Sequence, residues 1–168
     1  MGSLGDAGVS TLPPWLPAIL SVEPWCDAVV EALYVVFDRD FRRSRPLLDG
    51  KEVHYFQNVR PDGKEDIFWH LITTEVDERR TARTPDVPRA ARLPWVRCLI
   101  EHCAENEVRL WDYREHTGDV KTYIWFVDGD FLIIFKRLKD DRRRLLTSFF
   151  ILYGDYRRKL EKKYKKRV

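Results

Sequence analysis

The sequence predicts an α+β fold, in which N-terminal helices pack on an antiparallel four-stranded sheet and a basic helix closes the chain. Four short apolar, aromatic-rich runs lie between residues 107 and 152, and polar gaps separate them. This regular spacing is typical of an antiparallel meander. The expected strands are Val108–Tyr113, Lys121–Val127, Asp130–Arg137 and Arg144–Leu152. Such an apolar sheet needs a covering layer, and helical segments precede it in the chain.

The gaps between these runs are turn-like. The first gap, Arg114–Asp119, contains Gly118, and the third, Leu138–Arg143, is a solvated run of charges. Between them, Asp128-Gly129 predicts a tight two-residue hairpin, because glycine accepts a positive φ at no steric cost.

The N-terminal part of the chain divides into an extension and the start of the domain. We expect residues 1–22 to form a partly disordered extension, and residues 23–168 to form one α+β domain. From Trp25 the apolar residues recur at helical spacing, which predicts a helix to about Arg43, and Pro46 ends it.

The middle of the chain combines strands, a loop and a second helical region. Glu52–Val59 and Glu65–Thr73 are expected to pair as a hairpin around a Pro-Asp-Gly turn, and Glu75–Pro88 is expected to be an exposed loop. Arg89–Cys103 is helical by its period. After the meander, Gly154-Asp155 leads into the final helix.

The charge distribution indicates the kind of partner, and the cysteines indicate the cellular compartment. The net charge is only +3, but Tyr156–Val168 carries eight Lys or Arg against one Glu. This tract indicates a polyanionic partner, and a solvated terminal helix is the alternative. The three cysteines are an odd number without metal-type spacing, which favours reduced thiols in a cytoplasmic protein. We expect no signal peptide, no membrane span, no metal site and no cofactor.

Several short motifs occur in a familiar linear order between Leu33 and Lys163. They are Phe68-Trp69-His70, Arg89–Arg97, Trp111, Tyr123-Ile124-Trp125, Asp130–Ile134 and Leu145–Phe149, followed by a Lys-rich helix. This order resembles a group of bacterial phage-element proteins that are similar to the phage nucleases of the barnase–EndoU–colicin–RelE (BECR) type.

The resemblance implies a small BECR/RelE-like fold and a metal-independent ribonuclease, often a toxin. It implies RNA, including tRNA, as the partner, together with an inhibitor such as an antitoxin or immunity protein. One departure matters: the last strand of the family tends to read Thr-Ala-Tyr, whereas this chain has Thr147-Ser148-Phe149. The phenol that could bind or polarise phosphate is therefore missing.

Metal-free RNA cleavage needs a base, an acid and donors that stabilise the phosphoryl oxygens. His70 can give or take a proton near neutral pH. The alternative is a half-buried histidine that only makes hydrogen bonds in the core. Arg89 and Arg92 are helical neighbours that can bind phosphate, and the alternative is a solvated basic face. Arg97 points elsewhere on the helical wheel, and its role stays open.

The sheet offers further candidates. Thr147 matches the family motif and can position phosphate, whereas Ser148 faces the opposite side by strand alternation. Lys136 either points into the site or is a charge at a sheet edge that prevents aggregation. Trp111 and Tyr123 could stack RNA bases, with core packing as the alternative.

The sequence thus favours an endoribonuclease that uses the 2′-OH as nucleophile and leaves a 2′,3′-cyclic phosphate. His70, Arg89, Arg92 and Thr147 are its expected catalytic residues. Two alternatives remain: a non-catalytic module of the same fold that binds nucleic acid or protein, and a structural or regulatory phage-element protein.

Overall fold

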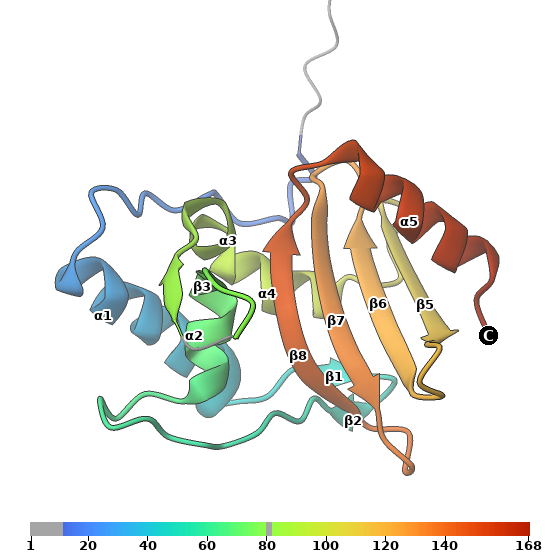
Figure 1. Ribbon diagram of the computed structural model, residues 1–168, viewed down its shortest axis with the longest axis horizontal. Helices are drawn as coiled ribbons and strands as arrows, with labels where there is room; N and C mark the ends of the chain where they lie inside the picture. The colour runs from blue at the N-terminus through green and yellow to red at the C-terminus, as the bar shows by residue number, and fades with distance from the viewer. Residues whose placement is uncertain (1–11, 80–81) are drawn as a thin grey trace, which may run out of the picture.

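The computed structural model describes residues 12–79 and 82–168 and has a mixed α+β architecture (Figure 1). Its main sheet has four antiparallel strands in the order β5-β6-β7-β8, so each strand pairs with its neighbour in the chain. The strands are β5 (Val108–Arg114), β6 (Val120–Phe126), β7 (Phe131–Arg137) and β8 (Arg143–Phe150). The predicted meander is confirmed, and its strand ends differ from the expected ones by one or two residues.

The turn between β6 and β7 differs from the expected two-residue hairpin. Phe126 and Phe131 are the last paired residues, so the loop holds residues 127–130. Its left-handed residue is Asp130, with φ of 49°, and not Gly129. A Cβ on Gly129 would lie 2.3 Å from the Phe126 ring and 3.2 Å from the Trp95 ring. Glycine is required here because the backbone passes close to these two rings.

Helices from the first two thirds of the chain lie behind the sheet and beside its β8 edge (Figure 1). They are α1 (Asp27–Phe37), which continues as the π-helix η1 (Asp38–Arg42), α2 (Asp66–Ile72), α3 (Val87–Ala91) and α4 (Leu93–Glu101). Figure 1 shows α4 behind the sheet, with α2 and α3 beside its β8 edge. The main core lies between these helices and the sheet, and includes the fully buried Phe37, Trp95 and Phe131.

The predicted hairpin of Glu52–Val59 with Glu65–Thr73 is wrong, because most of the second segment is the helix α2. Its buried residues Ile67, Phe68, Leu71 and Ile72 share one helical face. The first segment is mostly extended. Only its start belongs to β2 (Lys51–Glu52), which pairs with β1 (Leu47–Leu48). His54 makes an isolated parallel bridge to Arg144 on the outer edge of β8.

The stretch Glu75–Pro88 is also more ordered than an exposed loop. Its residues Arg83–Pro85 form β4, which pairs with β3 (Thr73–Glu75) as a small antiparallel hairpin. Asp86 then caps α3, because its side chain accepts a hydrogen bond from the backbone N–H of Arg89. This hairpin lies in front of α2 in Figure 1.

The helix α5 (Gly154–Lys165) crosses the other face of the sheet (Figure 1). Its Leu160 is buried there in a second apolar cluster with Trp111, Tyr123 and Trp125. Both faces of the sheet are therefore covered, at least over these aromatic residues.

The described part of the N-terminal extension packs on the domain. The Pro17 carbonyl accepts a hydrogen bond from the Trp95 indole at 2.8 Å, and Val22 is buried. Residues 1–11 of the extension that was expected to be partly disordered, residues 1–22, lie outside the described part of the chain. Among the described helices, none has the length and apolarity needed to cross a membrane.

Candidate functional site

A polar hollow of about 380 Å³ opens where α2, α3 and the β3–β4 hairpin meet the edge strand β8. Four separate parts of the sequence contribute to it: α2, the β3–β4 hairpin, α3 and β8. We call it the polar hollow, and its lining residues are His70, Thr74, Glu75, Arg83, Arg89, Thr147 and Phe149. The structure thus brings together His70, Arg89 and Thr147, which the sequence singled out.

His70 is held by a carboxylate one turn earlier on α2. Its Nε2 lies 3.3 Å from Asp66 Oδ2, and Arg60 Nη2 in turn lies 2.6 Å from Asp66 Oδ1. This contact exists only because the segment is a helix, which places residues i and i+4 on one face. Burial lowers the pKa of His70 and the charge of Arg83 lowers it further, while Asp66 acts in the opposite direction.

Arg89 forms part of the wall of the polar hollow, and its side chain is only 11% exposed. Its Nη1 donates to the backbone carbonyls of His70 at 2.8 Å and Thr73 at 2.9 Å, near the C-terminal end of α2. Its Nε lies 3.3 Å from Asp86 Oδ2. Burial lowers the pKa of this guanidinium, but an arginine remains charged at neutral pH. Arg89 therefore joins α3 to α2 and places a positive charge at the hollow.

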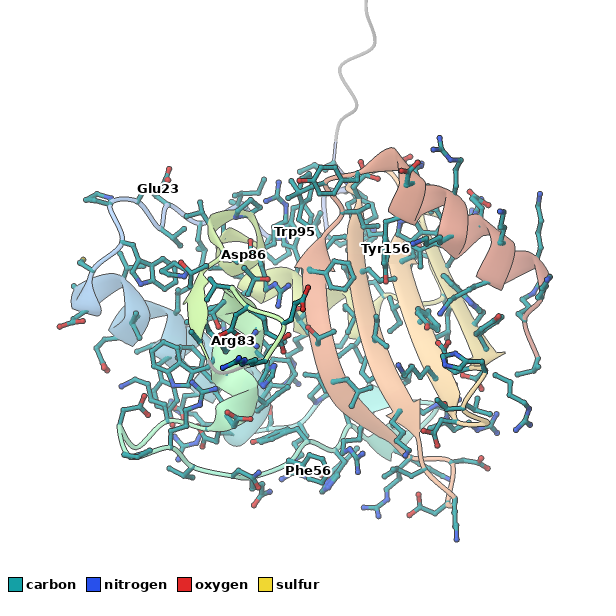
Figure 2. All side chains as sticks on the ribbon, in the orientation of Figure 1. Glu23, Phe56, Arg83, Asp86, Trp95 and Tyr156 are labelled. Atoms are coloured by element: carbon teal, nitrogen blue, oxygen red, sulfur yellow. The ribbon has the colours of Figure 1, made fainter. Side chains whose placement is uncertain are left out.

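Arg83 supplies a second positive charge from β4. Its Nε and Nη2 donate to the hydroxyl and the carbonyl of Thr73, each at 2.8 Å, and its Nη1 lies 3.5 Å from Glu75 Oε1. Burial lowers the pKa of Arg83 and Glu75 opposes this. Figure 2 shows the Arg83 side chain in front of α2.

Thr147 reaches the hollow from β8, and strand alternation explains its direction. It pairs with Ile134, whereas Ser148 pairs with Ile133 and is fully buried toward the helices. A bulge precedes it, because Thr147 opposes Ile134 and Leu145 opposes Phe135, which leaves Leu146 without a partner in the β7 register. Phe149 is two residues further and lines the same hollow.

Arg92 lies apart from the polar hollow, although it is close to Arg89 in sequence. The helix α3 ends at Ala91, and the Arg92 side chain donates to the Pro88 carbonyl at 2.8 Å. Its guanidinium carbon lies 4.3 Å from the centre of the Phe150 ring. It lines a different hollow, beside the segment 19–23.

Arg97 also lies elsewhere. It donates to the carbonyls of Asp40 at 2.7 Å and Ser44 at 2.6 Å, and to Glu101 at 2.7 Å. It connects α4 to the end of η1.

The aromatic candidates of the sheet are packed under α5. Trp111 and Tyr123 stack at 5.1 Å between ring centres and are each at most 3% exposed. The Tyr123 hydroxyl donates to Glu115 and accepts a hydrogen bond from Lys163 of α5. Burial raises the pKa of Tyr123, and Glu115 raises it further. In this structure neither ring can stack on a base, because α5 covers both.

Lys136 makes an ion pair with Asp119 at 3.3 Å in the neighbouring β5–β6 turn. It does not line the polar hollow.

A cysteine–histidine contact forms at the C-terminal end of α4. His102 lies 3.6 Å from the Cys98 sulfur, one turn earlier. Burial raises the pKa of Cys98 to about 11, and nearby carboxylates raise it further, so this thiol is protonated at neutral pH. Within residues 12–79 and 82–168, no group of three or more His, Cys, Asp or Glu side chains could hold a metal ion.

Sequence reasoning missed Glu75 and Arg83, because it treated residues 75–88 as an exposed loop. The β-branched residues Thr73, Thr74 and Thr84 are the signal that could have revealed the two short strands.

Comparison with known proteins gives no family to set beside this geometry. No family model, no curated protein and no solved structure matches the chain. Function is therefore inferred from the site itself.

Proposed function

We propose that the chain is a metal-independent endoribonuclease that cleaves RNA in the polar hollow. One observation carries the proposal: the imidazole of His70, the carboxylate of Glu75 and the guanidinium groups of Arg83 and Arg89 line one hollow with the Thr147 hydroxyl. These are the groups that 2′-OH transesterification needs.

The two arginines and Thr147 bind the phosphate. As the 2′ oxygen attacks, negative charge develops on the phosphoryl oxygens, and fixed donors beside them stabilise the transition state more than the substrate. Arg83 and Arg89 are held by backbone carbonyls, so their charges are already in position before RNA binds. The Thr147 hydroxyl adds a donor from the sheet.

Glu75 and His70 perform the two proton transfers. A carboxylate offers only acceptor oxygens, whereas an imidazolium offers two N–H donors. We therefore assign proton acceptance from the 2′-OH to Glu75 and proton donation to the leaving 5′ oxygen to His70. Asp66 at 3.3 Å opposes the lowering of the His70 pKa by burial and by Arg83.

The surroundings of the site fit a polyanionic substrate. Some basic side chains of α5 are engaged within the domain: Arg157 pairs with Asp130, and Lys163 lies 2.8 Å from Glu115. The remaining ones, such as Lys159 and Lys162, supply salt-sensitive attraction to an RNA backbone. By its resemblance to BECR-type phage nucleases, we propose that the protein acts in the cytoplasm as a toxin, with tRNA among its targets and an inhibitor protein over the hollow.

A non-catalytic RNA-binding module is the second candidate, and Phe149 favours it. This ring lines the polar hollow at the position where the family carries a tyrosine, so it offers no hydroxyl to the phosphate. Such a module would keep the arginines and bind RNA without cleaving it.

The test is incubation of the purified protein with total RNA and with tRNA in EDTA, beside His70→Gln. We expect cleavage with 2′,3′-cyclic phosphate ends, and a rate reduced by about 10²–10⁴ in His70→Gln, the usual contribution of a general acid. His116→Gln is the matched control, since His116 is exposed in the β5–β6 turn. Salt-dependent binding without cleavage would favour the non-catalytic module. Equal cleavage by His70→Gln and wild type would refute the assignment of His70.

A further inference from the structure

A second hollow, of about 500 Å³, lies beside the polar hollow and is lined by two tryptophans. We call it the tryptophan hollow. Its lining residues are Trp25, Arg60, Asp62, Trp69, Thr73, Arg83 and Pro85. They come from the segment before α1, the loop before α2, α2 itself and the β3–β4 hairpin.

Arg83 lines both hollows, so the two lie next to each other at this residue. Its bonds to Thr73 hold it in this position. A ligand whose phosphate lies in the polar hollow against Arg83 can therefore extend directly into the tryptophan hollow.

The lining of the tryptophan hollow suits a flat aromatic group with polar edges. Trp25 and Trp69 are both partly exposed, in contrast to Trp111 and Trp125, which are at most 3% exposed beneath α5. The guanidinium carbon of Arg60 lies 5.9 Å from the centre of the Trp69 ring. The rim also offers an acceptor, the carboxylate of Asp62. A nucleobase has a π-face that stacks on tryptophan and an edge that bonds to such groups.

We infer that the tryptophan hollow binds the base of a nucleotide next to the phosphate in the polar hollow. The inference rests on the proposed function, because it takes RNA as the ligand. It adds a base-binding subsite built on Trp25, Trp69 and Arg60, which lie outside the catalytic set. Base stacking thus occurs on Trp25 and Trp69 and not on the aromatic residues of the sheet.

A chain of contacts connects this subsite to the proton donor. Arg60, which lies over Trp69, donates from Nε to Asp66 Oδ1 at 2.7 Å, and Asp66 Oδ2 lies 3.3 Å from His70 Nε2. A base that contacts Arg60 can therefore shift Asp66, the residue that orients His70. Through this contact, base binding positions His70 for proton transfer.

The test uses a ligand that cannot be cleaved: a 2′-deoxy tetranucleotide and the same phosphodiester chain without bases. Binding of both to the wild type, Trp25→Leu and Trp25→Phe is measured by calorimetry at low salt, with circular dichroism to verify folding. We expect the wild type to bind the tetranucleotide about 10-fold more tightly than the abasic chain, the effect of one stacked base. Trp25→Leu should remove this difference, and Trp25→Phe, which keeps an aromatic ring, should retain most of it.

RNA cleavage, measured in parallel, separates this inference from the proposed function. If the wild type cleaves RNA but binds the tetranucleotide and the abasic chain equally, the subsite is refuted and the proposed function stands. If base-dependent binding disappears in Trp25→Leu while the wild type cleaves nothing, the subsite stands and the catalytic proposal fails. If no chain binds the wild type at low salt, or if Trp25→Leu binds like the wild type, the inference is overturned.

Discussion

Gly129, in the β6–β7 turn, provides a sharp test of the packing between the sheet and α4. Its Cα faces the fully buried ring of Phe126, and an added Cβ would lie 2.3 Å and 2.4 Å from two ring carbons. Ordinary contact begins near 3.4 Å, so Gly129→Ala requires the ring or the turn to move by about 1 Å. The ring has little room to move, because Trp95 packs against it edge-on at 5.8 Å between ring centres.

The expected cost follows from two opposing effects. Overpacking a close-packed core costs typically about 1–3 kcal/mol. Replacing glycine by alanine also restricts the unfolded chain, which offsets about 0.4–1 kcal/mol. We therefore expect Gly129→Ala to lose roughly 1–2 kcal/mol, which lowers Tm by about 2–8 °C in a chain of this size.

The assay is thermal unfolding followed by circular dichroism, with Gly154→Ala as the matched control. Gly154 is the first residue of α5, and a Cβ there would meet no atom within 4 Å. Because alanine favours a helix over glycine, the control should unfold at the wild-type temperature or slightly above it. If Gly129→Ala unfolds at or above the wild-type temperature, the close approach to Phe126 is not a real constraint.

Three further predictions concern the polar hollow. Burial and Arg83 lower the pKa of His70. If His70 is the acid, as proposed, RNA cleavage should fall as the pH rises through a value below about 6.5. Asp66→Asn removes the negative charge that raises the pKa of His70. Both the pH at which cleavage falls and the pH at which His70 titrates by NMR should therefore move to lower values. An unchanged titration of His70 would contradict the contact between Asp66 and His70. Thr147→Val should lower kcat/KM for RNA by about 10-fold or more, the loss of one hydrogen bond to a charged group, while Thr147→Ser should retain activity. Equal rates for these two variants would exclude a role for the hydroxyl.

The meander could be predicted from sequence because its signals are local. Each strand is an apolar run of suitable length, and each turn is marked by polar residues or glycine. The segment Asp66–Ile72 shows where such signals fail. Its aromatic and branched residues suit a strand, but Ile67, Phe68, Leu71 and Ile72 also form one helical face. A run this short fits the helical period and the strand period equally well, so tertiary packing decides which structure forms.

The polar hollow was predictable only in part, since it is assembled from residues 70 to 149. The sequence could indicate Thr147 over Ser148, because alternation fixes their relative directions once one face is buried. It could not separate Arg89 from Arg92. Three residues along a continuous helix are neighbours, but α3 ends between them, and Arg92 turns toward Phe150. A break in a helix therefore decided which arginine reaches the site.

Arg89 cannot be assigned to function or to folding alone. It donates to two carbonyls near the C-terminal end of α2, including that of His70, so the charge beside the hollow also fixes the helix that carries His70. Arg89→Gln would disturb the phosphate site and the position of His70 together. Arg83 separates the two effects better, because it donates to Thr73, the C-cap of α2, and not to His70 itself. A loss of cleavage in Arg83→Gln with unchanged thermal unfolding would therefore identify the phosphate site more directly than any change at Arg89.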